Sequence, residues 1–494
     1  MISGPRLDRD HPLVTARRVA RNTVYLTIAD AAGKLLMFVF FIVAARQLGV
    51  EQYGVLSFAL AFVAMFAVLA DLGLGAVTAR EIARDGSTAR QYVNSALTIK
   101  LIASVVLIAA VALVVRVLGY SGQAVTVTVV TSGFILVNAV ALLYTYVFQG
   151  YERTVFSALV RILQTAALTL GALVLARGQS GVVGYAWLYV GAAGLGALAA
   201  WMMASIVFVR PGLSFDLPFW RSLLGRSLPI GLAAAFAMLY YWNGSALLSR
   251  MSGDAAVGIY SASFRLVMGL GFIAQGFSGA VYPVMSRLYV SNRGRLEWVF
   301  SRSFQYIVML AVGLVVVGSF LSRPAIMLLY GAEYEASVPV LAVLVWWGGF
   351  MCLNVLLSFC FYAADQPRVV TRQTALALAL NLGLNLLLIP RYGAFGVAVA
   401  IVVAEGAGCC YLVVVLSRSV LRWNWRRLLR LLPRAAVAAG AAGVAGLLAT
   451  RWYASVGLLL GITSYPLFLL GLRALAREDI RLIKSVVGRG DGSR

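Results

Sequence analysis

Histidine is almost absent from this chain. His11 is the only one, and it lies in a polar N-terminal segment. Ser-His-Asp triads need a histidine base and many zinc sites need histidine ligands, so this scarcity excludes the triads and most histidine metal sites. The four cysteines, Cys352, Cys360, Cys409 and Cys410, all lie in apolar stretches. We therefore expect them to be small packing residues and not loop disulfides in an oxidising compartment.

Charged residues are also scarce, and one sign dominates. Only 12% of the residues are charged and 62% are hydrophobic, while 41 Lys and Arg against 18 Asp and Glu give a formal net charge of +23. So few charges cannot cover the surface of a soluble protein of 494 residues. The basic residues lie beside long apolar segments and are not clustered with aromatic residues on a polar domain. We therefore expect anionic membrane lipids, and no nucleic acid, as their partners.

Fourteen apolar segments are long enough to cross a membrane, since roughly 20 helical residues span about 30 Å of hydrocarbon. They lie near residues 22–45, 53–75, 92–116, 124–148, 155–176, 182–208, 227–249, 257–282, 303–322, 338–362, 369–389, 395–417, 432–450 and 455–472. The expected fold class is therefore all-α, a polytopic membrane protein of about 14 transmembrane helices.

The basic residues between these segments alternate in number along the chain. Eight rich segments hold 31 of them and seven poor segments hold 7. Because positively charged loops stay on the cytoplasmic side, the rich side is expected to be cytoplasmic, and so are both termini. The predicted location is the cytoplasmic (inner) membrane of a bacterium or an archaeon.

The two halves of the chain resemble each other. RQLGVEQYGVLS at 46–57 matches RMSGDAAVGIYS at 250–261 with four identities at an offset of 204, and GVVGYA at 181–186 matches GAFGVA at 393–398 at an offset of 212. Spans 1 to 6 and 7 to 12 are therefore expected to be two copies of one six-helix unit, equally oriented and related by an axis along the membrane normal.

The repeat and the charges together predict the domain organisation. We expect a cytoplasmic tail (1–21), a first six-helix lobe (22–209), a cytoplasmic linker (210–226), a second six-helix lobe (227–417), a basic amphipathic interfacial segment (418–434), transmembrane helices 13 and 14 (435–474) and a cytoplasmic tail (475–494). In the interfacial segment an arginine recurs every four residues, which suits a helix on the cytoplasmic leaflet. It either anchors the topology or recruits anionic lipid.

Four motifs resemble those of a known family. In chain order they are ARQLGVEQYGVLSFALAF, ADLGLGAVTAREIAR, LLYGAEYEASVPVL and LIPRYGAFGVAVA. They are similar to the polysaccharide-transport branch (O-antigen or lipid-linked oligosaccharide flippases) of the multidrug/oligosaccharidyl-lipid/polysaccharide flippase superfamily. The resemblance covers essentially the whole chain. It implies two six-helix lobes in a V shape, with spans 1, 2, 7 and 8 lining a cavity that opens alternately to each side, and a lipid-linked oligosaccharide as cargo.

Five ionisable residues inside the predicted spans are candidate site residues: Asp30, Lys34, Lys100, Arg265 and Glu405. Each costs about 2.5 to 3.5 kcal/mol on insertion scales, so each is expected to have a function or a partner. Asp30 and Lys34 are four residues apart on one helix face and form either a self-neutralising pair or a cavity site. In a cavity site Lys34 binds an anionic headgroup, while Asp30 orients it or couples an ion. Lys100 and Arg265 are further candidate substrate-binding cations, with snorkelling to the headgroups as the alternative.

Glu405 is the second candidate for ion coupling. The alternative is a hydrogen bond with a polar neighbour such as Asn381 or Asn385 on span 11. No catalytic residue, metal ligand or cofactor is expected, and the chain has no nucleotide-binding loop. Transport is therefore expected to be secondary.

The second copy of the repeat lacks the charges of the first. At the offset of 204, Ala234 and Met238 stand opposite Asp30 and Lys34. Span 7 instead carries Tyr240, Tyr241, Trp242 and Asn243 near its middle. Aromatic faces stack on sugar rings and amides bind hydroxyl groups, so these four are sugar-stacking candidates, with ordinary helix packing as the alternative.

The expected function is a secondary transporter that flips an undecaprenyl-diphosphate oligosaccharide for cell-surface polysaccharide synthesis, as in lipopolysaccharide O-antigen assembly. A polysaccharide polymerase and chain-length machinery are further expected partners. The alternatives are a lipid II flippase for peptidoglycan and a multidrug or cation antiporter of the same superfamily. A membrane-embedded glycosyltransferase or polymerase is remote, because it would need a large outer loop with catalytic carboxylates, so no enzyme is expected.

Overall fold

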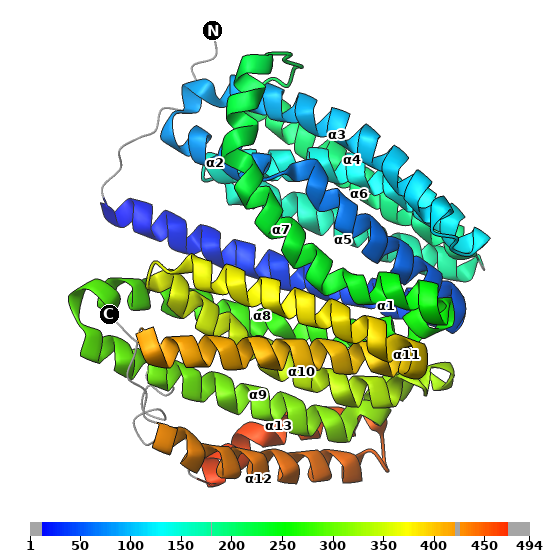
Figure 1. Ribbon diagram of the computed structural model, residues 1–494, viewed down its shortest axis with the longest axis vertical. Coiled ribbons are helices and arrows are strands. Elements are labelled where there is room, and N and C mark those ends of the chain that lie inside the picture. The colour runs from blue at the N-terminus through cyan, green and yellow to red at the C-terminus, as the bar shows by residue number, and fades with distance from the viewer. Residues whose placement is uncertain (1–11, 179, 420–424, 473–494) are drawn as a thin grey trace. The chain divides into compact units, whose positions relative to one another are not determined.

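The computed structural model describes residues 12–178, 180–419 and 425–472, with the side chains of 12–30 and 425–430 left out. Every regular element in these residues is a helix (Figure 1). The α-helices are α1 (Pro12–Asp71), α2 (Leu74–Arg84), α3 (Ala89–Val117), α4 (Gly122–Gly150), α5 (Thr154–Arg177), α6 (Val182–Val207), α7 (Leu217–Ser252), α8 (Asp254–Ser291), α9 (Arg293–Leu329), α10 (Ser337–Ala363), α11 (Pro367–Ser419), α12 (Trp425–Ala449) and α13 (Ala454–Gly471). Two 3-10 turns, η1 (Gly86–Thr88) and η2 (Ala332–Tyr334), complete the set.

Among the described residues, twelve helices are long and apolar enough to cross a membrane. Two of them are double. α1 is interrupted at Gly49 (φ 69, ψ 177) and α11 at Gly393 (φ 51, ψ −127). An unbroken helix of 60 residues would be about 90 Å long, three times the hydrocarbon thickness. The fold class is confirmed, and counting each half of α1 and α11 as one crossing gives the expected fourteen.

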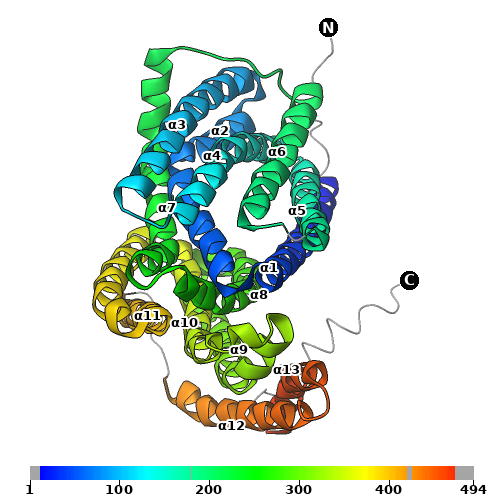
Figure 2. The same ribbon diagram turned by 90° about the vertical axis from the view of Figure 1, so that its right-hand side faces the viewer.

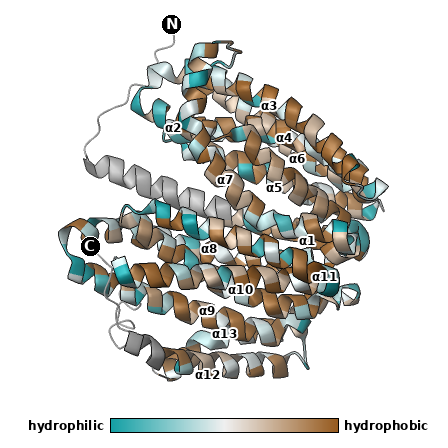
Figure 3. Cartoon of the chain, in the orientation of Figure 1, coloured by the Kyte–Doolittle hydropathy of each residue, from teal (hydrophilic) through white to brown (hydrophobic). Residues whose placement is uncertain are grey.

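Hydrophobic residues cover most of the length of the helices (Figure 3). Many of them point outward: Leu113, Leu170 and Ile206 are each more than 60% exposed. Outward apolar side chains in helices of this length are typical of lipid-facing surfaces, because a helix satisfies its own backbone hydrogen bonds and leaves only apolar atoms toward the lipid.

The end of predicted span 2 differs from expectation. We expected it to run to residue 75, but α1 ends at Asp71, and Leu72 (φ 46) and Gly73 (φ 75) are left-handed before α2 begins. A Cβ on Gly73 would lie 2.5 Å from the backbone oxygen of Ser227 on α7. Glycine is therefore needed here for both its conformation and its lack of a side chain.

The helices form two compact units. Among the described residues, unit 1 contains those up to Ser261 together with Asn385–Ala394, and unit 2 contains Ala262–Leu384 and those from Phe395 onward. In unit 1, α5 lies beside α1 and α6 (Figure 2). In unit 2, α12 and α13 pack on each other and on α9, where the Tyr465 hydroxyl donates to the backbone oxygen of Met309 at 2.7 Å. The lobe boundaries expected from the repeat stay a prediction.

Candidate functional site

The internal repeat is visible in the backbone of unit 1. Gly49 interrupts α1 with φ 69 and ψ 177, and Gly253, 204 residues later, separates α7 from α8 with φ 84 and ψ 172. Both conformations favour glycine. The two copies of the sequence motif therefore turn the chain in the same way.

The same two segments contact each other symmetrically. A Cβ added to Gly54 would overlap the backbone oxygen of Asp254, and one added to Gly258 would overlap the backbone oxygen of Val50. Val50 and Asp254 are 204 residues apart, as are Gly54 and Gly258. The contact is therefore unchanged when the two copies are exchanged, as in a two-fold interface, and it leaves no room for a side chain at either glycine.

Hydrogen bonds reinforce this symmetric contact. The Asp254 carboxylate accepts from the hydroxyls of Ser121 at 2.9 Å and Ser249 at 2.6 Å. The Tyr120 hydroxyl donates to the backbone oxygen of Ala246 at 3.3 Å, and burial raises the pKa of Tyr120, so this hydroxyl remains protonated. The turn between α3 and α4 in the first copy is thereby tied to the start of the second copy.

Lys34 is an exposed cation in the apolar part of α1. Two residues further along α1, the backbone oxygen of Leu36 accepts a hydrogen bond from the Thr169 hydroxyl of α5 at 2.8 Å. This bond fixes the position of α5 on this stretch of α1. Asp30 belongs to the same helix, but its side chain lies outside the described residues. Its pairing with Lys34 therefore stays a prediction.

Lys100 is fully buried and has a partner that the sequence did not single out. Its ammonium group donates to Asp71 Oδ1 at 2.5 Å and to the backbone oxygen of Ala139 at 3.5 Å. Snorkelling to the headgroups is therefore wrong for this conformation. Cargo binding by Lys100 stays a prediction, and the ammonium group is not accessible here. Asp71 lies inside predicted span 2, so an acidic residue in an apolar run was the signal that could have found it.

The aromatic candidates on α7 do not share one face. Tyr240 is buried, whereas Tyr241 and Trp242 are half-buried, because consecutive helical residues are about 100° apart. The rings of Tyr240 and Tyr241 meet edge to face at 5.4 Å. Sugar stacking stays a prediction, and Tyr241 and Trp242 have the accessible area for it.

Asn243, the fourth candidate on α7, is engaged in a polar contact inside unit 1. Its amide nitrogen donates to the backbone oxygens of Leu239 at 2.8 Å and Tyr240 at 2.9 Å. Its amide oxygen accepts from Asn385 Nδ2 at 2.8 Å. The buried Asn243 thus binds another helix segment in this conformation, and sugar binding by it stays a prediction.

Glu405 and Arg265 lie in unit 2. Glu405 is buried, and Asn354 Nδ2 of α10 donates to its Oε1 at 2.8 Å and to its backbone oxygen at 3.1 Å. The sequence pointed to Asn381 or Asn385 as its partner. Asn385 instead donates to Asn243, because this part of α11 belongs to unit 1. Arg265 is half-buried on α8, and its role as a cargo cation stays a prediction.

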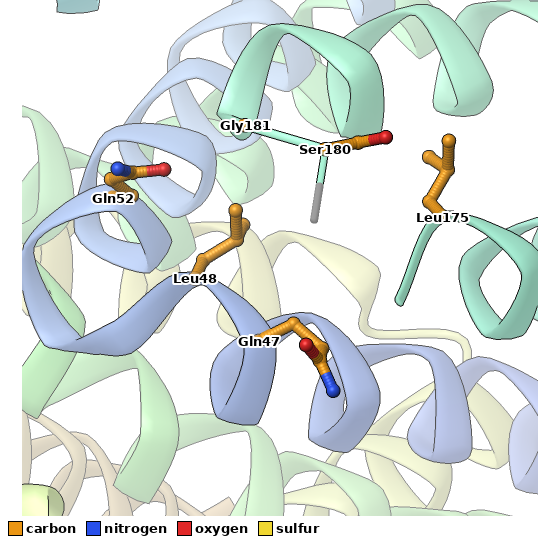
Figure 4. Close-up of a pocket in the computed structure, with 6 residues that line it drawn as sticks. All are labelled: Gln47, Leu48, Gln52, Leu175, Ser180 and Gly181. Carbon is orange, nitrogen blue, oxygen red and sulfur yellow. The ribbon is translucent and has the colours of Figure 1, made fainter. Parts of the chain in front are cut away.

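Unit 1 also contains a cavity of about 370 Å³ at the Gly49 turn (Figure 4). It is lined by Gln47, Leu48, Gln52, Leu175, Ser180 and Gly181. None of these residues is charged, so the cavity offers amide and hydroxyl groups but no cation. No predicted site residue lines it. Within the described residues no group of three or more His, Cys, Asp and Glu is placed to hold a metal ion.

Comparison with known proteins places this architecture in a family. The family model described as polysaccharide biosynthesis protein matches residues 19–289, and the model described as lipid II flippase MurJ matches residues 171–464. Each match covers more than half of the chain.

Relatives and solved structures agree with the family models. The probable low-salt glycan biosynthesis flippase Agl15 of Haloferax volcanii is 26% identical over 384 residues, covering 77% of this chain and 80% of that protein. The capsular polysaccharide biosynthesis protein CapF of Staphylococcus aureus is 20% identical over 391 residues, covering 78% and 96%. The structure of a lipid II flippase MurJ in an inward closed conformation superposes with a TM-score of 0.72 at 15% identity, covering 92% of this chain and 100% of that one. The chain therefore belongs to the polysaccharide biosynthesis protein family, in the flippase branch of the multidrug/oligosaccharidyl-lipid/polysaccharide superfamily.

Proposed function

We propose that this protein flips an oligosaccharide linked to undecaprenyl diphosphate, or to a related polyprenyl diphosphate, from the inner to the outer leaflet of the cytoplasmic membrane. The single observation that carries the proposal is an exposed cation, Lys34, in the apolar part of a helix in a chain of this family. A lipid-facing cation there would cost about 2.5 to 3.5 kcal/mol. An aqueous cavity that receives an anionic headgroup removes that cost.

Transport requires the symmetric contact at Gly54 and Gly258 to separate. By the predicted topology this contact lies at the outer ends of the helices, where a cargo would leave. The bond from the Ser121 hydroxyl to Asp254, which joins the two copies, then breaks and re-forms in each cycle. Serine–carboxylate bonds at a solvent-accessible end can exchange with water, so they favour the closed state without making opening prohibitive.

The membrane potential supplies the driving force. An inside-negative potential favours the outward transfer of a cargo with about two negative charges by roughly 4 to 5 kcal/mol per 100 mV. That is sufficient to bias flipping without ATP. If the bound complex is near neutral, the potential acts instead on the empty cationic cavity during its return, with Lys34 and Arg265 as the sensing charges.

A lipid II flippase for peptidoglycan is the second candidate. The match to the MurJ family model over residues 171–464 and the superposition on a lipid II flippase favour it. Both candidates carry a polyprenyl diphosphate, so the same cationic site serves either. The glycan is what separates them.

Deleting the gene tests this function. The lipid-linked glycan whose transport is blocked should accumulate on the inner leaflet, and wild-type protein should clear it, whereas Lys34→Ala should not, although it reaches the membrane. Rescue of a strain that lacks its lipid II flippase would assign peptidoglycan instead. Full clearance by Lys34→Ala would contradict the proposed role of this cation. A polysaccharide polymerase and chain-length machinery are the proposed downstream partners.

A further inference from the structure

Arg161 on α5 lies beside Gly33, the residue that precedes Lys34 on α1. The charge count groups Arg161 with the basic residues of a cytoplasmic loop, although it lies inside the predicted span 155–176. In the structure it is the eighth residue of α5, about 10 Å along the helix from Thr154, and its side chain is exposed. The Cγ and Cδ atoms of Arg161 are each 3.5 Å from the position of a Cβ on Gly33. The arginine stem therefore crosses α1 at the residue next to Lys34.

The two cations are at the same depth. Arg161 and Thr165 are beside Gly33, and the Thr169 hydroxyl binds the backbone oxygen of Leu36 at 2.8 Å. Residue numbers therefore rise together along α1 and α5, so the two helices run parallel. Lys34 and Arg161 thus enter the apolar region from the same end and reach similar heights.

Arg161 changes the charge balance of this region. Taken from α1 alone, Asp30 and Lys34 cancel. With Arg161 the three residues carry a net charge of +1. Like charges on adjacent helices repel each other. An anion with more than one charge that binds both cations offsets this repulsion.

We propose that Arg161 and Lys34 together bind the diphosphate of the cargo, and that Arg161 gives the site its preference for two phosphates over one. A guanidinium group presents a planar fork that matches phosphate oxygens bidentately, whereas an ammonium group acts as a point charge. Each of the two cations then binds one phosphate group of the diphosphate. This inference rests on the proposed function, because it assumes an anionic polyprenyl lipid as cargo.

Lipid binding to the purified full-length protein in detergent micelles tests the inference. The probes are tritiated polyprenyl diphosphate, polyprenyl monophosphate and uncharged polyprenol of equal chain length. In Arg161→Gln the preference for diphosphate over monophosphate should fall about tenfold, since one charge-assisted contact is lost. Arg161→Lys keeps the charge without the fork and should lose part of the preference.

Arg177→Gln is the matched control, because Arg177 is an exposed arginine at the opposite end of the same helix. It should leave the preference unchanged. An unchanged preference in Arg161→Gln would overturn the inference, and so would an equal loss of affinity for all three lipids, which indicates a structural role. If the wild-type protein binds all three lipids equally, the proposed function itself fails. Size-exclusion profiles of Arg161→Lys and Arg161→Gln establish that both variants are folded.

Discussion

The first helices of the two repeats, α1 and α7, lie in the same unit and can be compared residue by residue. Their turns are alike, because Gly49 and Gly253 adopt nearly the same backbone conformation. Their middles are not, because Lys34 has Met238 at the equivalent position. The two copies therefore share the backbone geometry of their contact, whereas the charge of Lys34 on α1 has no counterpart on α7.

The second helices differ in another way. In the first copy the chain breaks at Leu72 and Gly73, directly after Asp71, which pairs with Lys100. In the second copy α8 runs without a break over the equivalent positions, and Gln275 stands where Asp71 would be. The buried ion pair and the break therefore lie next to each other in the first copy, and the second copy has neither an acidic residue nor a break at the equivalent positions.

Breaking the ion pair of the first copy should give the largest effect. Asp71→Asn leaves the Lys100 ammonium group buried without its counter-ion, which destabilises a protein by about 3 to 5 kcal/mol. Thermal or denaturant unfolding in detergent measures this. Gln275→Ala, at the equivalent position of the second copy, should cost less than about 1 kcal/mol. The double variant Asp71→Lys with Lys100→Asp should recover part of the loss, and no recovery would mean that charge pairing is not the reason.

Filling the symmetric contact should have the next largest effect. Gly54→Val and Gly258→Val each place a side chain on backbone atoms of the other copy, where overpacking costs about 1 to 3 kcal/mol. Because the contact is symmetric, both variants should disfavour the closed state and impair flipping to a similar extent. Gly276→Val on α8 is the control, since a Cβ there meets no atom within 4 Å. Strongly unequal effects of the two substitutions would contradict the two-fold contact.

Exchanging the central residues of α1 and α7 tests the charge asymmetry. Lys34→Met should slow flipping about tenfold, equivalent to about 1.4 kcal/mol. Adding Met238→Lys restores the number of charges but places the cation away from α5 and Arg161. We therefore expect no rescue in the flipping assay. Restored flipping would show that either copy can hold the charge.

The turns that precede α3 and α9 allow the smallest test. The Ser87 hydroxyl, and to a smaller extent the Ser87 backbone N–H, donate hydrogen bonds to the Asp85 carboxylate. These bonds lower the pKa of Asp85 from its ordinary value of 3.8. This carboxylate stabilises the fold above the unfolded value of 3.8, and the contribution is lost as the pH falls through the lower folded value. The turn before α9 is capped by Asn292, which accepts from the backbone N–H of Arg295 at 2.9 Å and does not titrate.

The wild-type protein loses stability below pH 4, and Asp85→Asn should make this loss slightly smaller. Asn292→Asp should make it slightly larger. Melting curves of both variants between pH 3 and 6 measure the effect. An acid profile of Asp85→Asn identical to the wild type would contradict the assignment.

The sequence predicted the features that depend on composition and on local pattern. Long apolar runs predicted the crossings, and the spacing of Gly49, Gly54, Gly253 and Gly258 predicted the repeat. Contacts through space were not predictable in this way. Asp71 lies near the end of an apolar run, and Arg161 lies near the start of one, where a charge is equally compatible with the adjoining loop.

Partners chosen by packing were the hardest to predict. Glu405 binds Asn354, which is 51 residues away, and not the nearer Asn385. Asn385 instead donates to Asn243, which is 142 residues away along the chain, so the local sequence gives no sign of this contact. A single sequence does not show which residues pair across the fold.

Flipping in proteoliposomes tests the central claim, that the symmetric contact between the two copies opens to release an anionic cargo bound by Lys34 of the first copy. Wild-type protein and Lys34→Gln are reconstituted with a fluorescent oligosaccharide linked to polyprenyl diphosphate, and a potassium diffusion potential is applied. We predict that the wild type moves the lipid away from the negative side, faster as the potential rises, and that Lys34→Gln does so at least about tenfold more slowly. Equal rates in the two proteins, or a wild-type rate no higher than that of protein-free vesicles, would contradict the account.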